Sequence, residues 1–113
     1  MIKIKRIYEA KSPSDGYRIF IDRLWPRGLK KENAHFDLWL KEIAPSDRLR
    51  KWFSHDPKKW IEFRKKYLEE LTDRKKEIET VKEALQKQKI VTLLYGAKDE
   101  EHNNAVVLKD FLN

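Results

Sequence analysis

The chain contains no cysteine among its 113 residues, which excludes a disulfide framework, a thiolate nucleophile and a cysteine-based metal site. Its three glycines are too few for a glycine-rich phosphate loop, and neither common nucleotide-binding glycine motif occurs. No apolar run approaches the roughly 20 residues of a membrane span, and residues 1–5 lack the apolar stretch of a signal peptide. We therefore expect a cytoplasmic protein without membrane association, and the sequence identifies no cofactor.

What the chain has in quantity is charge and large apolar side chains. Apolar residues make up 40% and aromatic residues 12%, enough to fill the core of one domain covering residues 1–113. The net charge of +7 is uneven, because residues 1–89 carry 24 basic and 15 acidic groups, whereas residues 90–113 carry two and four. A basic body favours anionic partners. From residue 58 to 89, however, the mixture of Lys and Glu is also typical of a solvated helix face.

Two strands are predicted in the N-terminal part of the chain. In residues 2–7, isoleucines alternate with basic residues, which indicates a half-buried strand. Residues 17–22 are aromatic or β-branched and predict a second strand, which ends before the proline and glycine of residues 25–28. Residues 36–43 fit either a strand or a short helix, and we favour the extended form.

Helices are predicted in the middle of the chain, with Ser46 capping the first and Asp56–Pro57 starting the second. A break is expected near residues 72–73. The nearly continuous apolar run of residues 90–95 predicts a strand covered on both faces. A last helix should follow, with the carboxylates of residues 99–101 in its first turn. The prediction is a small layered α/β domain with a three- or four-stranded, largely parallel sheet and helices packed on it.

The strands at residues 17–22 and 90–95 are joined through helices, so they should be parallel and end at the same edge of the sheet. Ligands gather at such an edge. The candidate catalytic residues there are His102, because an imidazole titrates near neutral pH, and Asp22. The candidate ligand-binding residues, which mix cationic, aromatic and amide side chains, are Arg23, Trp25, Arg27, Tyr95, Lys98, Asp99, Asn103 and Asn104.

Structural roles compete with these assignments. Asp99 fits the cap of the last helix, and Asp22 fits a partner that orients Arg23. Trp25 could stack on a base, lie under a guanidinium or simply line its loop. Asn103–Asn104 is unusual inside a helix start, which hints at a functional use. No short metal-ligand spacing occurs, so no metal ligands are predicted.

Several strings of the chain are specific enough to compare with known families: Ile21–Gly28, Trp39–Lys41, Ala44–Ser46, Trp52–Phe53, His55–Asp56, Thr92–Tyr95 and Asp99–Ala105. They closely resemble the YeaO-like family, one branch of the DUF488 group of domains of unknown function. The resemblance implies a small α/β fold and brings no activity, substrate or cofactor with it. Longer members of the group look to have Glu-His-Cys-His where residues 101–104 fall, so Asn103 stands in place of a thiol.

Two functions follow from these features. The first is a site for a small anionic ligand that carries a phosphate or carboxylate and could be nucleotide-like, with general acid–base chemistry as an option. The alternative is a nucleic-acid-binding or regulatory module that uses the basic surface of residues 1–89. We favour the first, because acids and amides share the predicted edge with the arginines. The sequence does not decide the oligomeric state.

Overall fold

The computed structural model describes residues 1–113 and contains one sheet of four parallel strands in the order β1-β4-β2-β3. The strands are β1 (Ile2–Arg6), β2 (Tyr17–Phe20), β3 (Leu38–Trp39) and β4 (Val91–Tyr95). Leu93 in β4 pairs with Ile4 on one side and Ile19 on the other. The predicted fold class and the parallel pairing of the second and last strands are therefore confirmed.

Four helices accompany the sheet: α1 (Asp47–Phe53), α2 (Trp60–Leu71), α3 (Lys75–Lys87) and α4 (Asn104–Leu112). The predicted cap at Ser46 is confirmed, because its side chain accepts from the Leu49 N–H. The Asp56 side chain accepts from the Lys58 N–H and caps a 3-10 turn, Pro57–Lys59, which leads directly into α2. The predicted break near residues 72–73 separates α2 from α3. None of these helices is long and apolar enough to cross a membrane.

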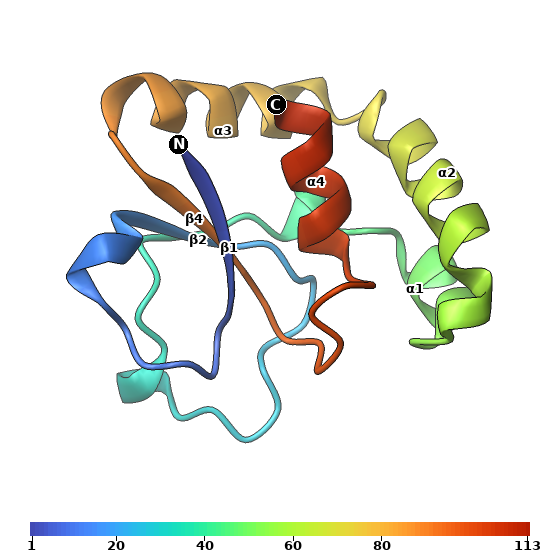
Figure 1. The fold of residues 1–113 in the computed structure, drawn as a ribbon, viewed down its shortest axis with the longest axis horizontal. Coiled ribbons are helices and arrows are strands. Elements are labelled where there is room, and N and C mark those ends of the chain that lie inside the picture. The colour runs from blue at the N-terminus through green and yellow to red at the C-terminus, as the bar shows by residue number, and fades with distance from the viewer.

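The two faces of the sheet are covered differently. All four helices lie on one side in Figure 1, and the long connections after β1 and β2 lie on the other. The helical side buries the main core, which includes Ile19, Leu93 and Leu108. The loop side buries a smaller cluster around Phe20 and Leu94. Every residue of β4 is therefore buried, as its apolar run predicts.

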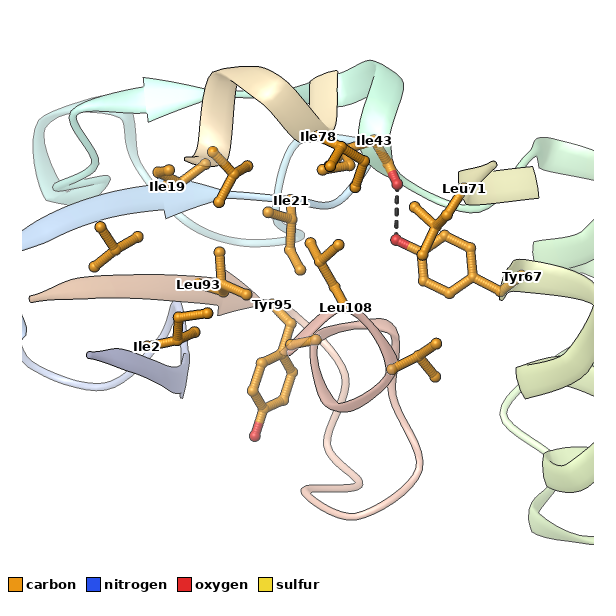
Figure 2. Packing of buried hydrophobic residues seen from close by; sticks show 14 of the residues in the cluster. Ile2, Ile19, Ile21, Ile43, Tyr67, Leu71, Ile78, Leu93, Tyr95 and Leu108 are labelled. Carbon is orange, nitrogen blue, oxygen red and sulfur yellow. Dashed lines mark hydrogen bonds between the residues drawn. The ribbon is translucent and has the colours of Figure 1, made fainter. Parts of the chain in front are cut away.

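A buried hydrogen bond links α2 to the segment before α1. The Tyr67 hydroxyl donates to the Ile43 carbonyl at 2.7 Å, as the dashed line in Figure 2 shows. Both residues are fully buried in the main core, together with Leu71 and Ile21. Burial raises the pKa of the Tyr67 phenol, so the hydroxyl stays a donor. This bond anchors the chain directly before Ala44 and Pro45.

A buried ion cluster ties the loop side together. Arg18 on β2 is 1% exposed and its guanidinium pairs with Asp15, which also lies 3.1 Å from the Lys5 ammonium. Although burial raises the pKa of Asp15, hydrogen bonds from the Ser12 N–H, Lys5 and Arg18 outweigh that effect and hold the pKa below its usual value. The cluster fixes the single 3-10 turn before β2.

Two local predictions need correction. Of residues 36–43, only Leu38 and Trp39 form a strand, and Lys41–Ile43 is a single 3-10 turn, because the chain must bend toward α1 after β3. The last helix begins at Asn104, and its cap is Asn103, whose side chain accepts from the Val106 N–H. The interpretation of residues 99–101 as the first turn of that helix is therefore wrong. These residues lie in a separate turn before the cap.

Candidate functional site

A pocket of about 230 Å³ opens at the edge of the sheet where β1, β2 and β4 end. Its walls come from the loops after these three strands, from α1 and the turn that follows it, and from the starts of α2 and α4. The pocket thus lies at the edge of the sheet where the sequence predicts that the strands of residues 17–22 and 90–95 both end. Its polar and charged lining residues are Asp22, Arg23, Arg27, Arg50, His55, His102, Asn103 and Asn104.

Asp22 occupies the centre of this edge, directly after β2. Its Oδ2 accepts from the Gly96 N–H at 2.9 Å, and its Oδ1 accepts from the Asn104 side chain at 3.0 Å. Burial raises the pKa of the Asp22 carboxyl, although these two hydrogen bonds act in the opposite direction. The carboxylate thus connects three segments. Its predicted role as the partner of Arg23 is wrong, because no ion pair joins the two residues.

The paired asparagines have distinct structural tasks. Asn103 is buried and caps α4, while Asn104, the first helical residue, donates to the Ile21 carbonyl and to Asp22. An Asn at a helix start is therefore no misfit here, since the helix begins one residue after Asn103. Both side chains line the pocket, but most of their hydrogen-bonding capacity is spent on protein partners.

His102 lies in the turn before α4 and lines the pocket. Its Nδ1 is 2.9 Å from Asp99 Oδ2, and its ring meets the Trp60 indole edge to face at 5.2 Å. Hydrogen bonds from the Glu101 N–H and from His102 hold the pKa of Asp99 below its usual value. Because an ionised carboxylate only accepts hydrogen bonds, the contact with Asp99 is one that His102 Nδ1 donates.

Asp99 itself does not line the pocket. One of its oxygens accepts from the Glu101 and His102 N–H groups, so it closes the turn before α4. The prediction that Asp99 caps the last helix is wrong, since Asn103 holds that place. Its carboxylate is linked to the pocket only by its contact with the His102 ring.

Three arginines reach the pocket, two from the loop after β2 and one from α1. Arg23 donates to the Ala44 and Pro45 carbonyls and lies 3.6 Å from Glu42. Arg27 is exposed, and its guanidinium has no hydrogen bond or ion pair within the chain. Arg50 on α1 contacts Asp47 at 3.3 Å, but its Nε is buried without any partner.

Of the aromatic and basic candidates, Trp25 lines the pocket, whereas Tyr95 and Lys98 do not. Tyr95 is the last residue of β4 and is buried in the main core, where Figure 2 shows it among the strand residues. Burial raises the pKa of its phenol. Lys98 is exposed beyond the pocket. Strand alternation accounts for the position of Tyr95, because Leu93 also faces the main core, whereas Leu94 between them faces the loop-side cluster.

Sequence reasoning missed Arg50, His55 and Tyr8, all of which line the pocket. In the structure Ser54 and His55 have φ values of 45° and 56°, the left-handed conformation that few residues other than glycine adopt. This tight reversal after α1 turns His55 toward Asp22, whose carboxylate its charge would stabilise. No periodic pattern signals such a turn.

No group of three or more His, Asp or Glu side chains is arranged to hold a metal ion. Among the pocket residues with ligand chemistry, Asp22 and His102 each spend at least one donor or acceptor position on a protein partner. The chemistry of the pocket is therefore that of a cationic cavity with one half-buried carboxylate and two imidazoles.

A model of the family described as "Inactive DUF488-N3 subclade" matches residues 1–113, the whole chain. The chain belongs to this DUF488 subclade. It is 46% identical over 111 residues to "Uncharacterized protein YeaO" of Escherichia coli (strain K12), a match covering 98% of this chain and 96% of that protein. It is 36% identical over 112 residues to "Uncharacterized protein Rv3073c" of Mycobacterium tuberculosis (strain ATCC 25618 / H37Rv), covering 99% and 93%. No solved structure matches the chain.

The DUF488 resemblance that the sequence shows is thereby confirmed. In this DUF488 chain, the two most distinctive strings, Asp22–Arg27 and Asp99–Asn104, come together at the pocket. The hydrogen bond between Asp22 and Asn104 is the direct link between them.

Proposed function

We propose that the pocket binds a small anion through a phosphate or carboxylate group. The observation that supports this most directly is the convergence of Arg23, Arg27 and Arg50 on one cavity whose only carboxylate, Asp22, already accepts two hydrogen bonds. A guanidinium fork matches the geometry of both anion types. The volume of about 230 Å³ is below that of common drug-sized pockets, which suits a small ligand.

The unpaired donors add to this support. Arg27 has no partner in the chain, and the buried Nε of Arg50 has none either. A buried donor without an acceptor costs free energy, and an incoming anion would relieve that cost. The start of α4 also faces the pocket through Asn103 and Asn104, and the positive end of a helix dipole favours negative charge.

Binding is favoured over turnover as the principal activity. The matching family is described as inactive, and Asn103 stands where longer relatives look to have a cysteine. A second candidate is general acid–base chemistry at His102, favoured by the 2.9 Å contact with Asp99 that orients its ring. Incubating the chain with each ligand that binds and following the solution by NMR tests that candidate, since a product that His102→Asn no longer forms would establish it.

Calorimetric titration with sulfate and with phosphate tests the anion site. Arg27→Ala and Arg50→Ala each remove a guanidinium from the pocket, and we expect each to weaken binding by on the order of tenfold. Arg48→Ala is the matched control, because Arg48 lies on the same helix as Arg50 but outside the pocket. It should leave sulfate affinity unchanged.

Equal weakening by all three variants would mean that net charge alone attracts the anion, and the proposed site would be wrong. The absence of measurable binding of either anion to the wild-type chain would also contradict it. Melting curves of each variant separate loss of binding from loss of the fold.

The alternative function is a nucleic-acid-binding module that uses the basic surface of residues 1–89. Binding of that kind depends on counterion release, so its affinity must fall steeply with salt. Titration of single- and double-stranded oligonucleotides at low and moderate salt tests it. A steep decline that Arg48→Ala reduces would favour this alternative, whereas the absence of binding at low salt would remove it.

A further inference from the structure

Trp25 differs from the other three tryptophans in what covers its ring. Lys41 lies 4.2 Å from the Trp39 ring centre, Lys59 and Lys66 lie over Trp52, and Phe63 stacks on Trp60. Trp25 meets Phe36 and Trp39 only at steep angles of 64° and 68°. No ring stacks on the Trp25 indole, and no cation lies over it, although arginines stand two residues away on either side.

The Trp25 ring is nevertheless held in position. Its Nε1 donates to the Leu29 carbonyl at 2.8 Å, which uses the single polar atom of the side chain. The indole is 39% exposed and lines the pocket. An immobilised aromatic ring with a free face is a ready stacking surface, because little side-chain entropy remains to be lost on binding.

Exposed apolar surface is concentrated around the same pocket. Six large apolar side chains are exposed in the whole chain, and Tyr8, Leu24 and Trp25 among them line this cavity. The Tyr8 hydroxyl donates to the Arg27 carbonyl at 2.8 Å, so that ring too is fixed by its polar end. A pocket for a purely inorganic anion would have no need of three apolar side chains at its mouth.

We propose that the ligand of this pocket is an anion that also carries a planar aromatic ring, which stacks on the Trp25 indole while the arginines bind its negative group. This inference rests on the proposed anion-binding function. Two sources share the required chemistry: a nucleoside monophosphate and an aryl phosphate. Each has one aromatic ring system and one phosphate, and both are small enough to be probed individually.

Calorimetry with three phosphates tests the inference: adenosine monophosphate, phenyl phosphate and ribose phosphate, which lacks an aromatic ring. Stacking on an aromatic side chain strengthens binding by about 1–3 kcal/mol per base, so at least one aromatic phosphate should bind on the order of tenfold more tightly than ribose phosphate. Tighter binding by adenosine monophosphate alone identifies a nucleotide, and by phenyl phosphate alone an aryl ligand. Tighter binding by both supports the shared chemistry.

Substitutions at Trp25 supply the second arm of the test. Trp25→Leu should abolish the preference for the aromatic phosphates and leave ribose phosphate binding unchanged, whereas Trp25→Tyr should retain part of the preference. Trp52→Leu is the control, because lysines already cover that indole on a different surface.

Equal affinity of the wild-type chain for all three phosphates would overturn the aromatic ligand and leave the anion site standing. Weakening of ribose phosphate by Trp25→Leu as much as of the aromatic probes would also overturn it, since Trp25 would then only support the loop. If none of the three phosphates bound, the proposed anion site would fail together with this inference.

Discussion

The Asn104 side chain donates a hydrogen bond to Asp22 Oδ1 at 3.0 Å, across 82 residues of sequence. This contact joins the loop after β2 to the first turn of α4, and the Gly96 N–H binds the other carboxylate oxygen. A Cβ on Gly96 would lie 3.0 Å from Asp22 Oδ2, so the absence of a side chain there allows the close approach. The floor of the pocket is thus one carboxylate shared by three segments.

Asn104→Ala should destabilise the chain by about 1–3 kcal/mol at pH 7, because it leaves a largely buried carboxylate oxygen without its donor. Burial raises the pKa of the Asp22 carboxyl, so the folded state favours its protonated form more than the unfolded chain does. The stability that Asp22 contributes is therefore fully present below its ordinary pKa, and it is lost as the pH rises through the raised pKa of the folded state. Chemical denaturation should therefore show a larger loss at pH 7 than at pH 3.

The matched control is Asn33→Ala, which removes an exposed amide that makes no side-chain hydrogen bond and should change stability by less than about 0.5 kcal/mol. A loss for Asn104→Ala that is independent of pH would contradict the coupling to Asp22.

Asp15→Asn should destabilise the chain by about 3–5 kcal/mol at neutral pH, because Arg18 would be left buried without its carboxylate. The pKa of Asp15 lies below its usual value of 3.8, so its stabilisation is present above that value and is lost as the pH falls through the folded pKa. Melting temperatures measured from pH 5 downward should converge for wild type and variant. Asp110→Asn, at an exposed ion pair, is the control and should have little effect.

Tyr67→Phe should cost about 1–2 kcal/mol, because it leaves the buried Ile43 carbonyl without a hydrogen bond. Urea denaturation measures the loss. Tyr17→Phe is the comparison, since the Tyr17 hydroxyl makes no hydrogen bond within the chain. Identical effects of the two substitutions would show that the bond to Ile43 contributes nothing.

Ser54→Gly and His55→Gly should each raise stability by about 1 kcal/mol, because glycine adopts a positive φ without steric cost. Only His55→Gly removes a side chain from the pocket. We expect it alone to weaken sulfate binding, measured by calorimetry beside the melting curves. Equal sulfate affinity in both variants would exclude His55 from the site.

Much of the fold can be predicted from local pattern, because alternation, apolar runs and capping residues act over a few neighbours. The apolar run ending at Tyr95, the cap at Ser46 and the start at Asp56–Pro57 all have such signals, and each prediction is confirmed. The predicted start of α4 lies too early in the chain, because Asp99 and Asn103 are both good caps. Only packing against Asp22 and Ile21 decides between them.

The sequence by itself determined that two polar segments, Asp22–Arg27 and Asp99–Asn104, end up at one edge, since helical connections make their strands parallel. Only the tertiary structure decided which side chains face the cavity. Lys98 stayed outside the pocket, whereas Arg50 and His55, from a helix and a strained turn, reached it. Chain direction follows from local connectivity, but side-chain orientation depends on how distant helices pack around that edge.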